Sequence, residues 1–356
     1  MSVVVIAEAG VNHNGEPDLA YQLIDAAAEA GADFVKFQTF KAGSLVTRSA
    51  VKAAYQQKTT NSNENQYMML KKLELSQDFH HDLVKYCDIK NIRFLSTAFD
   101  HESLAFLNNE LNLNVLKISS GDITNGPLIL AHAHTDKDII LSTGMSTLGE
   151  IEDALGVLAY GFLGDKTEPS REAFRRAYFS DSGRYLLKEK VTLLHCTTEY
   201  PAPPEDINLK VMGTLSRAFG LNVGYSDHSK GIAIPVAAAA LGACVIEKHF
   251  TLDRNMQGPD HKASLEPDEL ASMIQSIRII EKALGNSIKT PMPSELGNLS
   301  VARKSLVAIE DIKKGDIFTA GNLGIKRPGT GISPMAYWDV INTVSEAEYS
   351  VDQVLK

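Results

Sequence analysis

The chain has 356 residues, of which 44% are hydrophobic and 22% charged, and its formal net charge is -9 at pH 7. This length exceeds what one hydrophobic core usually organises, so a large domain and a smaller one are expected. The acidic balance argues against a nucleic-acid partner, and no apolar run reaches the roughly 20 residues of a membrane span, so no membrane partner is expected either. Because the start of the sequence lacks the pattern of a secretory signal, we expect a cytoplasmic protein.

Short apolar runs alternate with longer amphipathic stretches along most of the chain, which is typical of repeated strand–helix units with parallel strands. Eight strands are predicted, at residues 3–8, 34–38, 93–97, 115–118, 139–142, 191–195, 222–225 and 245–250. Eight such units predict an α/β fold in which the sheet closes into a (β/α)8 TIM barrel. An open, doubly wound sheet is the alternative, and it is disfavoured because Gly10 and Gly15 stand too far apart for a glycine-rich dinucleotide turn.

Three segments lie outside the simple repeat. Residues 161–190 are polar and charged and predict a helical insertion before the sixth strand. Residues 285–300 are rich in glycine, proline, serine and asparagine, which is typical of a linker. Residues 301–356 carry short strand-like runs and turn signals, so they predict a small β-rich domain. The expected barrel therefore occupies residues 1–284.

The ends of the predicted strands are unusually polar. In a (β/α)8 barrel the active site forms at the carboxyl ends of the strands, so side chains at these positions are expected around one mouth. The polar residues at or just after the strand ends are Glu8, Lys36, Gln38, Thr97, Lys117, Ser120, Thr198, Tyr200, Ser226, His228, Glu247, His249 and Asp260.

Two of these residues, His228 and His249, end adjacent strands. A lone histidine is more often a hydrogen-bonded structural residue, but a pair at corresponding positions of consecutive strands favours ligation of one divalent metal ion. Two imidazoles without thiolates also suit a catalytic metal with open positions. The three cysteines, Cys87, Cys196 and Cys244, are widely spaced in apolar surroundings and are interpreted as reduced core thiols.

Lys36 and Lys117 would supply positive charge to the same mouth. Such charge, with hydroxyl donors beside it, suits a ligand that carries a phosphate next to a carboxylate, as phosphoenolpyruvate does. The donors available for this role are Thr97, Ser120 and Ser226. For either lysine the alternative is a buried ion pair with a barrel carboxylate, Glu247 or Asp122.

Four carboxylates are candidates for proton transfer or for orienting the site. Glu8, Glu247 or Asp260 could deliver a proton or position a water molecule for a reaction at this mouth. Asp227 adjoins His228, so an orienting role is favoured for it. The sequence does not distinguish Glu8 from Glu247 as the residue that transfers the proton.

Longer motifs contain these residues: IAEAGVNHNG, ADFVKFQTFKA, FLSTAFD, LKISSGDITN, LLHCTTEYPAP, VGYSDHSKGI and ACVIEKHFTLDRNMQGPDHKAS. Together they resemble the bacterial sialic acid (nonulosonic acid) synthase family, whose members make N-acetylneuraminate or N,N'-diacetyllegionaminate. The resemblance covers residues 3–284, and the tail, with SLVAIEDIKKGDIF and IKRPGTGIS, resembles the antifreeze-protein-like SAF domain of that family.

The resemblance implies a transferase that condenses phosphoenolpyruvate with an N-acylated hexosamine, N-acetylmannosamine or 2,4-diacetamido-2,4,6-trideoxymannose, and releases phosphate. It implies a divalent ion on His228 and His249, manganese first, with magnesium or cobalt as alternatives. The residues it assigns to phosphoenolpyruvate are Lys36, Thr97, Lys117, Ser120, Thr198 and Ser226. Those it assigns to the sugar are Glu8, Gln38, Tyr200, Glu247 and Asp260. It further implies a domain-swapped homodimer in which Arg327 reaches the sugar's acyl group across subunits.

Two positions depart from the family pattern: Ala98 stands where proline is usual, and Thr198 stands where some relatives have asparagine near the phosphate. Neither removes a charge or a metal ligand. The choice between the two sugars stays open. A carbohydrate-binding barrel without catalysis is the alternative function, and it is disfavoured because the histidine pair, both lysines and Glu8 are all present. Ice binding through the tail is more remote still.

Overall fold

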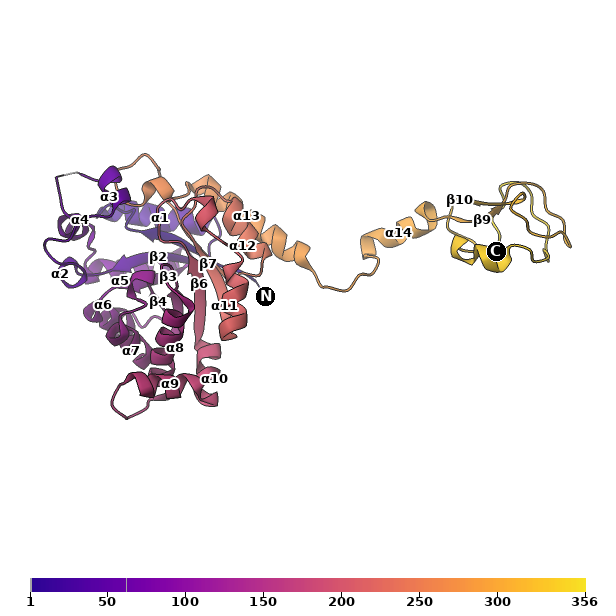
Figure 1. The fold of residues 1–356 in the computed structure, drawn as a ribbon. Helices are drawn as coiled ribbons and strands as arrows, with labels where there is room; N and C mark the ends of the chain where they lie inside the picture. Colours follow the sequence, from indigo (N-terminus) through magenta and orange to yellow (C-terminus); the bar gives the residue numbers. More distant parts are fainter. Residues whose placement is uncertain (1, 62) are drawn as a thin grey trace. The chain divides into compact units, whose positions relative to one another are not determined.

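The computed structural model describes residues 2–61 and 63–356 and divides into two compact units, Met1–Gly285 and Asn286–Lys356. The first unit is a closed barrel of eight parallel strands in sequence order, β1 to β8, with β8 pairing back to β1 (Figure 1). Its strands are β1 (Val4–Gly10), β2 (Phe34–Thr39), β3 (Arg93–Ala98), β4 (Val115–Ile118), β5 (Asp138–Ser142), β6 (Val191–Cys196), β7 (Asn222–Asp227) and β8 (Val245–His249). The predicted fold and all eight strands are thus confirmed.

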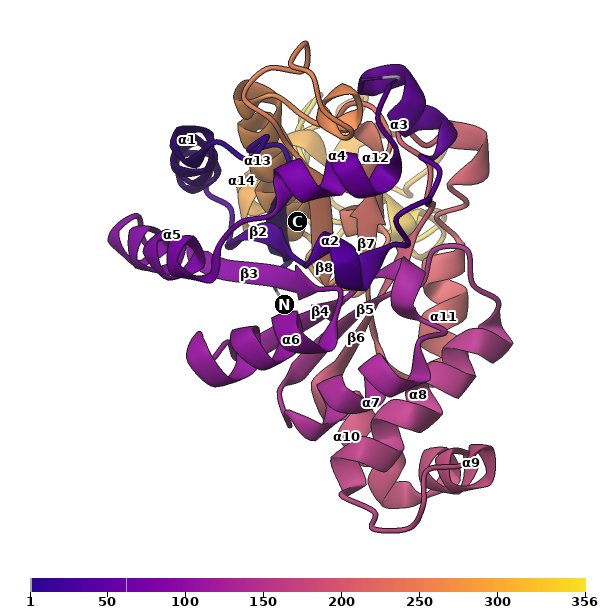
Figure 2. The same ribbon diagram turned by 90° about the vertical axis from the view of Figure 1, so that its left-hand side faces the viewer.

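Helices surround this barrel (Figure 2). They are α1 (Pro17–Glu29), α2 (Ala42–Leu45), α3 (Ala54–Thr59), α4 (Gln66–Leu73), α5 (Gln77–Ile89), α6 (His101–Ala105), α7 (Gly126–His134), α8 (Leu148–Leu163), α9 (Arg171–Phe179), α10 (Asp181–Lys190), α11 (Val211–Phe219), α12 (Ala233–Ala240) and α13 (Pro267–Leu284). Shorter 3-10 or π turns lie at Phe106–Glu110, Ser120–Asp122, Pro204–Asp206 and His261–Ala263. The insertion predicted before the sixth strand forms α9 and α10, which contact α8.

The interior of the barrel is layered because side chains on a strand alternate between its two faces. One layer is apolar, and it consists of Ile6, Phe34, Leu95, Ile140, Leu194 and Val245. Two residues further along the same strands comes a polar layer with Glu8, Lys36, Thr97, Ser142, Cys196 and Glu247. On β7 the position below Ser226 is Gly224, where a Cβ would lie 2.4 Å from the carbonyl oxygen of Val245. The apolar layer therefore closes the barrel beneath the polar one.

The second unit has a small core formed by Leu306, Ala308, Ile312, Phe318, Leu323 and Leu355. Strands β9 (Ser305–Ala308) and β10 (Leu323–Lys326) pair antiparallel, and α15 (Tyr337–Val340) follows the 3-10 turn Pro334–Ala336. Isolated bridges such as Ile312 to Tyr349 tie the remaining turns together. This is the small β-rich domain that the sequence predicts.

The segment predicted to be a linker is partly helical. Helix α14 (Pro293–Ala302) begins inside it, with Pro293 at its first turn and the Glu295 carboxylate accepting a hydrogen bond from the Met292 amide at 2.8 Å. Proline is favoured at the first turn of a helix, so its presence in a polar segment marked a helix start and not only a break. Across the described residues, none of the helices has the length and apolar character that a membrane crossing requires.

Candidate active site

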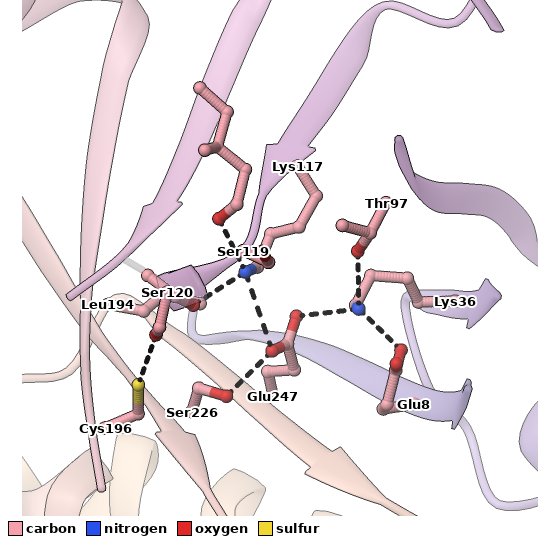
Figure 3. A network of polar contacts seen from close by, with 12 residues as sticks. Glu8, Lys36, Thr97, Lys117, Ser119, Ser120, Leu194, Cys196, Ser226 and Glu247 are labelled. Atoms are coloured by element: carbon pink, nitrogen blue, oxygen red, sulfur yellow. Dashed lines mark hydrogen bonds and ion pairs between the residues drawn. The ribbon is translucent and has the colours of Figure 1, made fainter. Parts of the chain in front are cut away.

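The polar layer at the carboxyl ends of the strands holds a connected network of two lysines and two glutamates (Figure 3). The Lys36 ammonium lies 2.7 Å from the Glu8 carboxylate and 3.5 Å from that of Glu247. The Lys117 ammonium lies 4.0 Å from the other oxygen of Glu247, so both lysines share this one carboxylate. All four side chains are at most 7% exposed. Both lysines therefore form the buried ion pair with Glu247 that was the alternative expected from the sequence. Asp122, the other carboxylate considered for such a pair, accepts a hydrogen bond from Ser119.

Hydroxyl groups hold the ends of this network in place. Lys36 donates to Thr97 Oγ1 at 3.1 Å, and Lys117 donates to Ser142 Oγ at 2.6 Å. Ser226 donates to Glu247 Oε1 at 2.7 Å. Because every charged group here is fixed by neighbours from other strands, the network is preorganised before any ligand arrives.

The two glutamates have different electrostatic environments. Burial raises the pKa of Glu8 to about 7, because the opposing effect of the nearby Lys36 ammonium does not offset it. Burial acts in the same direction on Glu247, but the Lys117 and Lys36 ammoniums outweigh it and hold that pKa at about 2. For Lys36, burial is outweighed by the charges of Glu247 and Glu8, which raise its pKa. Protonation of Glu8 makes the cluster net positive, which suits an anionic ligand.

Beside Lys117 lies a corner formed by Ser120, Gly144, Cys196 and Thr198. The Gly144 amide donates to Ser120 Oγ at 2.9 Å, and Ser120 Oγ lies 3.1 Å from Cys196 Sγ. A Cβ at Gly144 would come within 2.3 Å of Thr198 Oγ1, so this corner is closely packed and requires glycine. Thr198 Oγ1 is buried and has no hydrogen-bond partner within residues 2–61 and 63–356. A buried hydroxyl without a partner beside a lysine is suitable for binding a phosphate oxygen.

The two candidate metal ligands are close to each other. The imidazole rings of His228 and His249 have their centroids 5.6 Å apart, and the ring of Tyr200 lies 4.2 Å from His228. His228 Nδ1 is 2.7 Å from the carbonyl oxygen of Thr197, which leaves Nε2, 3.5 Å from Ser226 Oγ, as the electron-pair donor. His249 Nδ1 is buried and has no partner in the described part of the chain.

These histidines fit a divalent metal ion. Burial lowers the pKa of both, so each imidazole is in the neutral form that binds metals. They supply two ligands only, since the described residues contain no group of three or more histidine, cysteine, aspartate or glutamate side chains arranged to hold a metal. An ion held here would keep open positions for water or substrate oxygens.

Three residues predicted to face the sugar lie on the histidine side of the same mouth. Gln38 donates to Glu8 Oε1 at 3.3 Å, and Asp260 Oδ2 lies 3.9 Å from His249 Nδ1. Burial raises the pKa of Asp260 to about 6. Tyr200 is tilted against Tyr55 of α3, with ring centroids 5.1 Å apart. Arg327, which was also predicted to contact the sugar, is exposed in the second unit, and its role stays a prediction.

Sequence reasoning missed several residues of the site. Cys196, interpreted as a core thiol, lies in the polar layer, and its place two residues after the inward-facing Leu194 was the available signal. Ser142 was expected at the end of the fifth strand but was given no role, although its place two residues after Ile140 puts it in the same layer as Lys117 Nζ. Tyr55 had no comparable signal, because only tertiary contacts bring α3 over the ring of Tyr200.

A closed parallel barrel that buries lysines, glutamates and a histidine pair at its carboxyl-end mouth defines a class: α/β-barrel enzymes that act on small anionic substrates. Comparison with known proteins narrows this class. The NeuB family matches residues 23–289, and the SAF domain matches residues 303–347. The chain belongs to the NeuB family.

Individual relatives agree with this assignment. The chain is 52% identical to N,N'-diacetyllegionaminic acid synthase of Campylobacter jejuni, over 99% of this chain and 98% of that protein. It is 43% identical to the synthase of the same name from Legionella pneumophila, over 96% and 90%. Among solved structures, N-acetylneuraminic acid (sialic acid) synthetase from Leptospira borgpetersenii in complex with citrate is 34% identical, with a TM-score of 0.66 over 84% of this chain and 90% of that one.

Proposed function

We propose that this protein condenses phosphoenolpyruvate with an N-acylated amino-sugar aldehyde and water, giving a nonulosonic acid and inorganic phosphate. The observation that carries the proposal is the pair of buried lysines that share Glu247, close to the buried Thr198 hydroxyl that has no hydrogen-bond partner among the described residues. The similarity to two N,N'-diacetyllegionaminic acid synthases favours 2,4-diacetamido-2,4,6-trideoxymannose as the sugar and N,N'-diacetyllegionaminate as the product. N-acetylmannosamine, giving N-acetylneuraminate, is the alternative pair.

Phosphoenolpyruvate would bind through its two anionic groups. Lys36 and Lys117 would neutralise its charge, and hydroxyls of the polar layer would fix its orientation. The hydroxyls in question belong to Thr97, Ser120, Thr198 and Ser226. Gln38, Tyr200 and Asp260 would contact the sugar, which places the aldehyde on the histidine side of the mouth.

The bonds change in two stages. The C3 carbon of the enol attacks the aldehyde carbon, and the aldehyde oxygen takes up the electron pair and a proton from the Glu8 carboxyl. Water then adds to the C2 oxocarbenium, and Glu8, now a carboxylate, accepts the proton that this water loses. In the collapse of the tetrahedral intermediate the C2 carbonyl forms, the bond between C2 and the phosphate oxygen breaks, and the departing phosphate takes up the proton of the C2 hydroxyl. Glu8 ends as it began, and a pKa of about 7 suits both of its steps.

His228 and His249 would hold the divalent ion, for which we propose manganese, with magnesium or cobalt as alternatives. When bound, such an ion supplies Lewis-acid polarisation of a carbonyl oxygen. We also propose that the protein is cytoplasmic and acts as a domain-swapped homodimer, in which Arg327 of one subunit contacts the acyl group of sugar bound to the other. The exposure of Arg327 outside the barrel unit is consistent with this arrangement.

Phosphate release tests the proposed function. Metal-stripped protein is resupplied with manganese and given phosphoenolpyruvate with each of the two sugars in separate reactions. We expect metal-dependent release with a preference for the diacetamido sugar, and loss of release in a His228→Ala variant. If neither sugar gives metal-dependent release and the variant behaves like the parent, the catalytic proposal fails and a carbohydrate-binding role takes its place.

A further inference from the structure

Behind the two histidines lies a buried ion pair that the proposed reaction does not use. The Lys248 ammonium is 2.6 Å from the Asp227 carboxylate, and both side chains are 0% exposed. Asp227 immediately precedes His228, and Lys248 immediately precedes His249, in two paired strands. We propose that Asp227 and Lys248 are positioning residues that fix the separation of His228 and His249 for a divalent ion, an inference that rests on the metal role in the proposed function.

Strand geometry places this pair outside the reacting layer. Asp227 and Lys248 are partners in the register of β7 and β8. Neighbouring residues on a strand point to opposite faces, so side chains next to the inward-facing Ser226 and Glu247 point into the barrel wall. The pair therefore connects the two strands directly behind the histidines without reaching the mouth.

Hydrogen bonds extend the pair around the backbone of His228. Asp227 Oδ1 accepts from the Ser229 amide at 2.9 Å and from the Tyr225 hydroxyl at 3.2 Å. Lys248 donates both to Asp227 and to the carbonyl oxygen of Ser229. The residues on either side of His228 are thus fixed to the residue that precedes His249.

Stability alone does not explain two charges at this place. Removing an ammonium and a carboxylate from water costs several kcal/mol each, and apolar residues of similar volume often serve a fold equally well. What the pair adds is fixed geometry, because its hydrogen bonds restrain the backbone that carries both imidazoles. Metal binding depends on such restraint, since ligand distances must lie within about 0.2 Å of their preferred values.

The test is manganese affinity, measured by calorimetry or electron paramagnetic resonance on the full chain without substrates. In the double variant Asp227→Asn, Lys248→Met, the amide keeps acceptors for Tyr225 and Ser229 while both charges are removed. We expect manganese binding to weaken by about 10–100-fold, the range typical for residues that orient metal ligands. We also expect phosphoenolpyruvate affinity to be unchanged and the circular dichroism spectrum to match that of the parent.

A matched control removes an ion pair elsewhere in the barrel unit. Arg278 lies 2.9 Å from Asp33, whose carboxylate also accepts a hydrogen bond from the Val5 amide. The double variant Asp33→Asn, Arg278→Met should bind manganese with the affinity of the parent. Parent affinity in the Asp227 and Lys248 variant as well would overturn the inference.

If the charged-pair variant does not fold, Tyr225→Phe provides the second measurement. This change deletes one hydrogen bond to Asp227 and keeps the ring, so we expect manganese binding to weaken by about 2–5-fold, as a lost bond of about 0.5–1 kcal/mol would give. Unchanged affinity in a folded Tyr225→Phe variant would also overturn the inference. A parent that binds manganese but makes no product contradicts the proposed function and leaves this inference standing.

Discussion

Replacement of Glu8 by glutamine tests whether Glu8, and not the other buried glutamate, Glu247, donates the proton in the reaction. Burial raises the pKa of Glu8 from 4.5 to about 7, so about half of the molecules carry this proton at pH 7. A carboxyl group with a pKa of 4.5 would be protonated in roughly one molecule in 300 at that pH. Glu8 is therefore able to donate a proton at neutral pH, whereas Glu247, with a pKa of about 2, is not.

We expect kcat in the Glu8→Gln variant to fall by about 10²–10⁴-fold, which corresponds to an increase of roughly 3–5 kcal/mol in the activation free energy. The KM for phosphoenolpyruvate should change little. In the parent, kcat/KM should decline above about pH 7, because Glu8 is then deprotonated and cannot donate the proton that the first stage needs. This alkaline limb of the pH profile should be absent from the variant. The assay is phosphate release across pH 5.5 to 9 at saturating metal, with exposed Glu110→Gln as the matched control. A limb near pH 7 that persists in Glu8→Gln would refute the assignment.

Three further outcomes are expected. Gly144→Ala places a methyl group within 2.3 Å of Thr198 Oγ1, so the KM for phosphoenolpyruvate should rise at least about tenfold while the KM for the sugar stays constant in the same steady-state assay. Burial lowers the pKa of His132 to about 4, so this histidine must gain a proton on unfolding below pH 6.5 and its contribution to stability is lost as pH falls from 6.5 through 4. His132→Leu should therefore flatten the pH dependence of the unfolding free energy in that window by at most about 3 kcal/mol, measured by urea denaturation; an unchanged slope contradicts this. Removal of metal by chelation should abolish phosphate release and manganese should restore it, and activity that persists after stripping would count against the histidine site.

The sequence was sufficient for the barrel because each strand carries its own signal. Apolar runs separated by amphipathic stretches marked every strand, and only the ends moved, as where β7 continues to Asp227 instead of stopping at Tyr225. Strand ends in a barrel are decided by pairing with neighbours, which local pattern does not report. Helix α14 was missed for a different reason, because composition alone predicted a linker, although Pro293 stands at the first turn, where proline is favourable.

The sequence predicted those residues of the candidate site that lie at the carboxyl ends of the strands. The lysines, the histidine pair and the carboxylates all came from that rule, and the structure brings them together at one mouth of the barrel. The difference between Glu8 and Glu247 was not predictable, because it depends on how many ammonium groups each carboxylate meets across the barrel. The close packing at Gly144 likewise depends on side chains from three other positions on different strands and loops.

The most direct test of the account is identification of the product. Protein with manganese, phosphoenolpyruvate and 2,4-diacetamido-2,4,6-trideoxymannose is analysed by mass spectrometry alongside the phosphate assay, with Lys117→Met as the comparison. We predict one nonulosonic acid for each phosphate released by the parent, and neither product above background from the variant. Phosphate release without a matching nine-carbon acid would identify a hydrolase and contradict the central claim of carbon–carbon bond formation at this mouth.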